Sequence, residues 1–295
     1  MGLEKSNLPN VSVIVPVYNA QNSIKECVDS ILSLDYPNEK LEFIFVNNSS
    51  TDNTQGLLEE YNGRIRILYE RKKGPAAARN KGILNSTGEI IAFTDSDCTV
   101  DKNWLKNIVN PLRDERIGIV GGKILSKRPC NKIEEFGELI HDHYRAINVY
   151  KPPYAITMNW ASRRSVLMDV GLFDESFTRC EDVDLSHKIM QADYRLLYEP
   201  DAIIYHSNEK TISGLFIEGL KHGFWSIKAH KKWNDLISRI GHRRFNFETY
   251  KDLVKSLFNY IAGKDRHHNM CNFFFNLGKK IGKIAGSFRF LYVEL

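Results

Sequence analysis

The most informative stretch of this chain is an apolar run that ends in two aspartates: Ile90-Ile91-Ala92-Phe93-Thr94-Asp95-Ser96-Asp97. A short apolar run closed by turn residues predicts a buried strand. Side chains two apart on a strand point to the same side, so we expect Asp95 and Asp97 to lie together. Two carboxylates there suit a hard divalent cation that keeps positions free for phosphate oxygens. The alternative interpretation of an Asp-x-Asp pair is a solvated turn or a helix cap.

The composition bounds the class of protein. At 295 residues, 42% of them hydrophobic and 26% charged, the chain has the size and composition of a soluble globular protein with one large or two small domains. No apolar run approaches the ~20 residues that span a bilayer, and residues 1–10 lack the apolar core of a signal peptide. The five cysteines are scattered and odd in number, which argues against a disulfide framework or a zinc site and favours a reducing cytosol.

The net charge of +5 is distributed unevenly along the chain. Residues 210–295 hold 16 Lys and Arg against 6 Asp and Glu, whereas residues 1–209 hold 25 against 30. A basic tail therefore follows an acidic body. Such tails often meet an anionic surface, either membrane or nucleic acid, and the alternative is a solvated helical face.

Strands and helices alternate in the first half of the chain. Ser23 and Glu26 have the spacing of a capping box at the start of one helix. We predict strands at 11–17, 41–46, 64–69, 89–94 and 117–120, and helices from Ser23, from 51 or 52, over 75–84 and over 104–112. This alternation predicts an α/β fold with a mostly parallel sheet covered on both faces. Ligands of such sheets bind outside the carboxyl ends of the strands.

The second half adds further candidate groups. Glu181 and Asp182 open an amphipathic helix, where acidic residues stabilise the positive end and either one could also serve as a general base. A predicted strand ends at His206, which is a candidate ligand if a metal lies nearby. The glycine-rich signatures of Rossmann dehydrogenases and P-loop enzymes are absent from the sequence, so a bound pyrophosphate would need another anchor.

Over about residues 10–210 these motifs together resemble glycosyltransferase family 2, the inverting, nucleotide-sugar-dependent enzymes with the GT-A fold. The motifs that carry the resemblance are Val11 to Asn19, Val46 to Asp52, Gly74 to Gly82, Asp95-Ser96-Asp97, Asn159 to Asp174 and Glu181-Asp182. The resemblance implies a Rossmann-like, mostly parallel sheet with flanking helices. We expect a catalytic domain over 1–209, with a nucleotide-sugar half at 10–122 and an acceptor half at 123–209, and a mainly helical basic extension over 210–295.

The resemblance also implies the chemistry and its residues. Asp182, beside Glu181, would be the base that deprotonates an acceptor hydroxyl. Asp97 would be the principal ligand of Mn²⁺ or Mg²⁺, together with Asp95 and His206. The residues that would bind the nucleotide and donor sugar are Pro16, Val17, Tyr18, Asn19, Asn47, Asn48, Arg79, Asp95 and Ser96. Asn159 and Trp160 would lie on the acceptor side.

Two features depart from the pattern of relatives, the asparagine pair at 47 and 48 and the tryptophan at 160. Asn47 and Asn48 stand where relatives commonly have a carboxylate that faces the nucleobase, and an amide can both accept and donate. Uracil is the first choice of base, and guanine and thymine stay open. Trp160 replaces a small or flexible residue of many relatives, and it either stacks on an acceptor sugar or belongs to the core.

The leading function is thus a metal-dependent hexosyltransferase that acts in the synthesis of surface glycans or lipid-linked saccharides. The alternatives are a sugar nucleotidyltransferase and a non-catalytic nucleotide-sugar-binding protein on the same fold. The tail mixes aromatic residues with cations at 225–233 and 273–284, a pattern typical of helices that lie in a membrane interface. We expect a peripheral protein on the cytoplasmic face of a membrane; a homodimer contact is the alternative for the tail, and nucleic-acid binding is disfavoured.

Overall fold

A computed structural model describes residues 8–239 and 248–293 of the chain. By their internal contacts the residues form two compact units, residues 1–127 with 142–206 and residues 128–141 with 207–295. The domain bounds expected above, 1–209 and 210–295, stay a prediction. Among the described helices, none is both long and apolar enough to cross a membrane.

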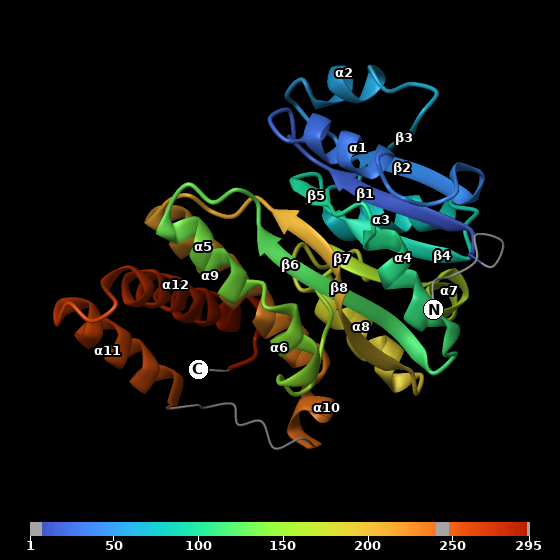
Figure 1. Cartoon of the computed structure of the whole chain (residues 1–295). Coiled ribbons are helices and arrows are strands. Elements are labelled where there is room, and N and C mark those ends of the chain that lie inside the picture. The colour runs from blue at the N-terminus through green and yellow to red at the C-terminus, as the bar shows by residue number, and fades with distance from the viewer. Residues whose placement is uncertain (1–7, 240–247, 294–295) are drawn as a thin grey trace. The chain divides into compact units, whose positions relative to one another are not determined.

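The first unit is built on an eight-stranded sheet in the order β3-β2-β1-β4-β7-β6-β8-β5 (Figure 1). The strands are β1 Val11–Val17, β2 Leu41–Asn47, β3 Arg66–Tyr69, β4 Ile90–Thr94, β5 Cys98–Val100, β6 Ile117–Ser126, β7 Asn159–Arg163 and β8 Arg195–His206. Four neighbouring pairs are parallel, β1 with β2, β1 with β4, β2 with β3 and β6 with β8, and the other three are antiparallel. The predicted α/β fold with a mostly parallel sheet is confirmed.

Helices cover both faces of this sheet. They are α1 Ile24–Leu32, α2 Thr54–Glu59, α3 Pro75–Leu84, α4 Trp104–Val109, α6 His143–Asn148, α7 Arg164–Asp169 and α8 Glu181–Gln191, with short 3-10 turns η2 Asn38–Lys40 and η3 Asn110–Arg113. Val13 and Val15 of β1 join a hydrophobic cluster with residues of α1, α2 and α4, whereas Ile14 joins a second cluster with residues of α3, α7 and α8. The alternation along β1 therefore places one helical layer on each face of the sheet.

Two local predictions differ from the structure. Ser23 precedes α1 but makes no side-chain cap, because its φ of −127° and ψ of −24° are not the extended geometry of a capping residue. Its hydroxyl instead donates to the carbonyl of Ala20, and Glu26 pairs with Lys127. The predicted strand that ends at His206 begins earlier, at Arg195, because its first half pairs with β6.

The second unit is helical, as predicted for the tail. Its elements are α5 Lys132–Ile140, α9 Ile212–Lys232, α10 Asn234–Arg239, α11 Glu248–Ile261 and α12 Arg266–Phe290. Helices α9 and α12 pack backbone to backbone: a Cβ added at Gly223 would lie 2.0 Å from the carbonyl oxygen of Lys279, and one at Gly282 would lie 2.0 Å from that of Leu220. Only glycine allows this approach. Phe136 of α5 joins Leu215 and Cys271 in a small core of the same unit.

Candidate active site

The loops after β1 and β2 are tied to one another at the carboxyl end of the sheet. The backbone N–H of Asn19 donates to Ser50 Oγ at 3.0 Å, and that of Thr51 donates to Asn19 Oδ1 at 2.8 Å. Tyr18 is exposed, Pro16 is half-buried and the Val17 side chain is fully buried. Tyr18 and Asn19 are thus the two predicted nucleotide-binding residues of this loop that are exposed to solvent.

Asn47 and Asn48 are both engaged by the protein. Asn48 is buried, its amide nitrogen donates to the carbonyls of Glu70 and Lys72 at 3.1 and 2.7 Å, and its amide oxygen accepts from Gly74 N–H at 2.8 Å. Asn47 accepts from Ser50 N–H and donates to Gln55. Asn48 therefore fixes the segment 70–74, which leads into α3, and both of its N–H donors are already in use. The expected contact of Asn48 with a nucleobase stays a prediction.

Arg79 of α3 is the centre of a buried ion network. Its Nη2 lies 2.8 Å from Asp95 Oδ1 and its Nη1 lies 2.7 Å from Glu181 Oε1, and the arginine and glutamate side chains are both buried. One guanidinium thus joins three elements: α3, the end of β4 and the start of α8. The fork geometry of arginine suits it to hold two carboxylates at once. The sequence motif placed Arg79 at the nucleotide but did not reveal this bridge.

The pKa of Glu181 is perturbed by this setting. Burial raises the pKa of the carboxyl to about 7, with a further contribution from the neighbouring charge of Asp182, while the guanidinium of Arg79 opposes the shift. A carboxyl group whose pKa is strongly shifted by burial and by a neighbouring charge is a frequent mark of a functional site.

The Asp-x-Asp pair does not have the geometry that the sequence predicted. Strand β4 ends at Thr94, and Asp95, Ser96 and Asp97 form a turn into β5, which pairs antiparallel with β8. Asp95 pairs with Arg79, whereas Asp97 Oδ2 lies 3.5 Å from His206 Nε2. The two carboxylates therefore have different partners, because strand alternation ends one residue before the pair begins.

Asp97 and His206 are two candidate metal ligands that the fold brings together. The Asp97 side chain is 45% exposed and His206 is mostly buried beside it, where the pairing of Cys98 with His206 brings the two chain segments together. A carboxylate and an imidazole are both ordinary ligands of Mn²⁺ and leave further positions for phosphate oxygens. Within residues 8–239 and 248–293, no three His, Cys, Asp or Glu side chains gather as a metal cluster.

Glu181 and Asp182 occupy the first turn of α8. Cys180 precedes the helix in a left-handed conformation with φ of 64°, and Asp182 Oδ1 accepts from the N–H of Val183 at 2.8 Å. Asp182 is half-buried, and burial together with the charge of Asp182 raises the pKa of Tyr154. Asp184 is fully buried 3.5 Å from Lys188, in keeping with a structural role.

The two residues expected on the acceptor side lie inside the fold. Trp160 is buried, with its ring centroid 4.9 Å from that of Phe93 and 6.1 Å from that of Phe173. It therefore belongs to the core, which was the alternative to stacking on an acceptor sugar. Asn159 is fully buried and accepts from the indole N–H of Trp104 at 2.7 Å. Both belong to β7, a central strand that the sequence did not predict.

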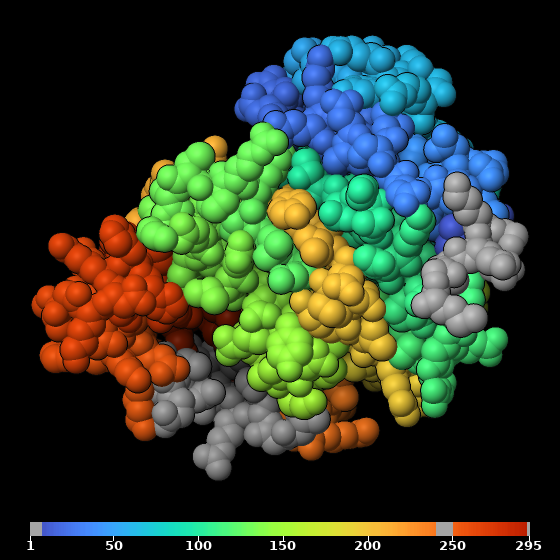
Figure 2. Space-filling model, in the orientation of Figure 1, coloured from blue at the N-terminus to red at the C-terminus, as the bar shows by residue number. Residues whose placement is uncertain are grey.

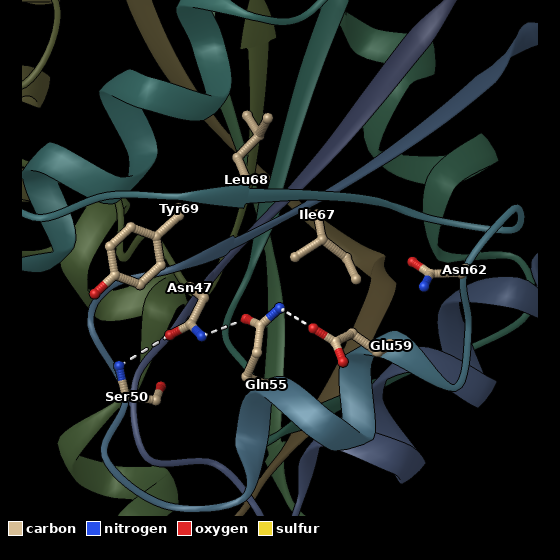
Figure 3. A pocket seen from close by; sticks show the side chains of 8 residues that line it. All are labelled: Asn47, Ser50, Gln55, Glu59, Asn62, Ile67, Leu68 and Tyr69. Carbon is tan, nitrogen blue, oxygen red and sulfur yellow. Dashed lines mark hydrogen bonds between the residues drawn. The ribbon is translucent and has the colours of Figure 1, made fainter.

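A separate pocket of about 460 Å³ opens between β2, α2 and β3 (Figure 3). Figure 3 shows Asn47 bonded to Ser50 and to Gln55, which in turn bonds to Glu59. Its lining includes Asn47 but none of Arg79, Asp95, Asp97, Glu181 or His206. The pocket is thus distinct from the ion network and from the Asp97–His206 pair.

Comparison with known proteins places this chain among glycosyltransferases. The profile described as Glycosyl transferase family 2 matches residues 12–171. Glycosyltransferase AglE of Haloferax volcanii is 32% identical over 207 residues, which are 68% of each chain. The pre-mycofactocin glycosyltransferase of Mycobacterium tuberculosis is 30% identical over 68% of this chain and 43% of its own, and the poly-β-1,6-N-acetyl-D-glucosamine synthase of Staphylococcus epidermidis is 27% identical over 78% of this chain and 60% of its own. The chain thus spans only about half the length of some relatives.

Solved structures with the same fold include two that hold nucleotide sugars. The mannosyltransferase PcManGT from Pyrobaculum calidifontis, in complex with GDP-Man and Mn²⁺, aligns with 97% of this chain and 77% of its own at a TM-score of 0.64 and 21% identity. TarS of S. aureus in complex with UDP-GlcNAc aligns with 96% of this chain and 92% of its own at a TM-score of 0.57 and 17% identity. At these identities the likeness shows the fold alone.

Proposed function

Because the chain belongs to glycosyltransferase family 2, we propose that it moves a hexose from a nucleotide-diphosphate sugar to an acceptor hydroxyl, with inversion at the anomeric carbon. The observation that carries the proposal is the Arg79 bridge between Asp95 and Glu181. It links the turn at Asp95–Asp97, on the proposed donor side, to the first turn of α8, which contains the candidate base Asp182. Donor and acceptor groups of a displacement must meet within one site, and this bridge would fix that site.

Asp182 is the proposed base. It is half-buried and follows Glu181 in the first turn of α8. As a carboxylate it would take the proton of the acceptor hydroxyl while that oxygen bonds to the anomeric carbon. A positioned general base typically contributes ~10²–10⁴-fold to the rate. Glu181 would position the turn through Arg79, because its carboxylate is already bonded there.

Asp97 and His206 would hold a divalent cation, Mn²⁺ or Mg²⁺. Their 3.5 Å separation and their ligand types support this assignment, as does the Mn²⁺ held by a neighbour of the same fold. When bound, the cation would neutralise the diphosphate that leaves as the sugar is transferred. With the leaving group neutralised in this way, the chain needs no acidic residue to protonate it.

We propose a UDP-sugar as donor and a growing surface glycan or lipid-linked saccharide as acceptor. The UDP-GlcNAc and GDP-Man held by structural neighbours, and a relative that synthesises poly-β-1,6-N-acetyl-D-glucosamine, support this class of substrate. The work would take place on the cytoplasmic face of a membrane, with the basic tail in contact with it.

A donor screen tests the proposal. UDP-, GDP- and TDP-sugars are incubated with the protein and Mn²⁺ or EDTA, and release of the nucleotide is measured. Asp182→Asn should lower kcat at least ~100-fold with little change in donor KM. Asp169→Asn, which changes an exposed aspartate on α7, is the matched control and should keep full activity. Absence of nucleotide release with every donor, or a fully active Asp182→Asn, would overturn the proposal.

A further inference from the structure

Helix α11 carries an exposed apolar stripe. Val254, Phe258 and Ile261 are spaced four and three residues apart, which places them on one face of the helix. All three are exposed, Phe258 to 65% of its surface. Apolar side chains of this size are normally buried in a core. Their exposure here therefore indicates that this face of α11 binds a partner.

Helix α12 continues the pattern. Ile281, Ile284 and Phe288 are spaced three and four apart on one face, and Leu291 follows at the end of the helix. All four are exposed, Phe288 to 80%. The opposite side of α12 is taken by Gly278, Gly282 and Gly286, which are buried against the backbone of α9.

The two helices form one hairpin, which Figure 1 shows with α11 beside α12. Lys280 Nζ lies 3.8 Å from the ring centroid of Tyr250, and Arg266 lies 5.4 Å from that of Tyr260, so α11 runs antiparallel to α12. The close glycine packing of α12 on α9 joins this hairpin to the rest of the helical unit. In Figure 2 the orange-red side chains of the hairpin form part of the open molecular surface.

The charge of the hairpin identifies the partner. Residues 248–293 hold eight cations, Lys251, Lys255, Lys264, Arg266, Lys279, Lys280, Lys283 and Arg289, against three acids, Glu248, Asp252 and Asp265. A second copy of so basic a surface would be repelled, whereas anionic headgroups would be attracted. Exposed Phe, Ile, Leu and Val beside Lys and Arg are the composition of helices that lie in a membrane interface.

We propose that the α11–α12 hairpin is a membrane-docking surface, whose exposed apolar residues enter the interface of an anionic phospholipid bilayer while its lysines and arginines contact lipid phosphates. The inference rests on the membrane setting of the proposed function but not on its sugar-transfer chemistry. Docking would hold the chain where a lipid-linked acceptor is found.

Vesicle co-sedimentation of the full chain tests this surface. The protein should pellet with vesicles of phosphatidylcholine and phosphatidylglycerol, much less with phosphatidylcholine alone, and partly dissociate at high salt. The double variant Phe258→Ser/Phe288→Ser should lower partitioning at least tenfold, and Lys255→Gln should lower it roughly fivefold on anionic vesicles only. Leu139→Ser, at an exposed apolar position of α5 outside the hairpin, should bind like the parent.

Each other outcome overturns the assignment. Equal pelleting with anionic vesicles, neutral vesicles and buffer would exclude lipid as the partner. A parent dimer in sedimentation velocity that Phe258→Ser/Phe288→Ser converts to monomer would identify a second copy instead. Full vesicle binding by that double variant would show that another surface of the protein binds the lipid. Nucleotide binding is also measured without vesicles. If it is intact while vesicle binding is lost, the docking proposal has failed and the catalytic proposal has not.

Discussion

Arg79 Nη1 lies 2.7 Å from Glu181 Oε1, although the two residues are 102 positions apart in the chain. Both side chains are buried, and the same guanidinium also bonds Asp95. Charges removed from water in this way are stable only when their partners stay in place. Removal of any one of these three side chains should therefore destabilise the other two. Substitutions of Arg79 and of Glu181 test this arrangement.

Arg79→Lys should destabilise the fold and the site. A lysine keeps the charge, but its single ammonium cannot donate to two carboxylates in the planar fork of a guanidinium. One of the two carboxylates would then lack its donor, which typically costs about 1–3 kcal/mol or more. Urea unfolding measures the loss, and Arg66→Lys, in a surface pair with Glu42, should change stability by less than about 1 kcal/mol. Equal stability of the two variants would contradict the central role of Arg79.

Glu181→Gln should flatten the pH dependence of stability. The pKa of Glu181 is raised from its ordinary value of 4.5 to about 7, so the folded state holds the proton more tightly than the unfolded state. Its contribution to the free energy of unfolding is present below pH 4.5 and is lost as pH rises to 7. Urea unfolding at several pH values between 4.5 and 7.5 measures the slope. Glu60→Gln, on the surface, should keep the parent slope; an unchanged slope in Glu181→Gln would show that another group titrates.

Asp97→Ala and His206→Ala should each weaken Mn²⁺ binding. The two side chains are the carboxylate and imidazole that the fold brings within 3.5 Å, and each would supply one ligand. Loss of either should raise the Mn²⁺ dissociation constant at least tenfold in the presence of UDP, measured by titration calorimetry. Asp35→Asn, in a surface pair with Lys106, is the control. Unchanged Mn²⁺ affinity in both alanine variants would place the metal elsewhere.

Asn48→Asp should lower the stability of the fold and should not change which nucleobase the protein prefers. The amide nitrogen of Asn48 donates to two carbonyls, and a carboxylate there would face the oxygens of Glu70 and Lys72 without a donor. A buried acceptor left against acceptors costs about 1–3 kcal/mol or more. Thermal unfolding measures the effect, with Asn148→Asp on the exposed end of α6 as control. A stable Asn48→Asp with altered base preference would instead make this residue the nucleobase contact.

Gly282→Ala should loosen the helical unit. The added Cβ would lie 2.0 Å from the carbonyl oxygen of Leu220, so α9 and α12 would have to separate. Overpacking of this kind typically costs about 1–3 kcal/mol. Thermal unfolding compares it with Gly56→Ala in α2, where the nearest atom is the end of the Asn53 side chain, which can move. Similar melting temperatures for both variants would show that the α9–α12 contact tolerates a methyl group.

The sequence determined the elements that depend on local signals. Helix α3 occupies the predicted residues, because Pro75 starts it at a favoured position and small residues follow. Strand β1 also matches, since a segment with five Val and Ile residues among its seven suits a strand covered on both faces. The alternation of such elements was sufficient for the fold class, and the ordered motifs were sufficient for the family.

Tertiary structure decided what depends on partners distant in the chain. Spacing alone suggested that Asp95 and Asp97 point together, but the pairing of β5 with β8 turns the chain and gives them Arg79 and His206 as separate partners. Trp160 could not be assigned to the core until β7 was seen between β4 and β6. In the sequence the glycines of α12 have no evident role. The structure shows that they allow the backbone of α9 to pack against α12. Local propensity and pattern act over a few residues, whereas the direction of a buried side chain is set by the strands, helices and charges that enclose it.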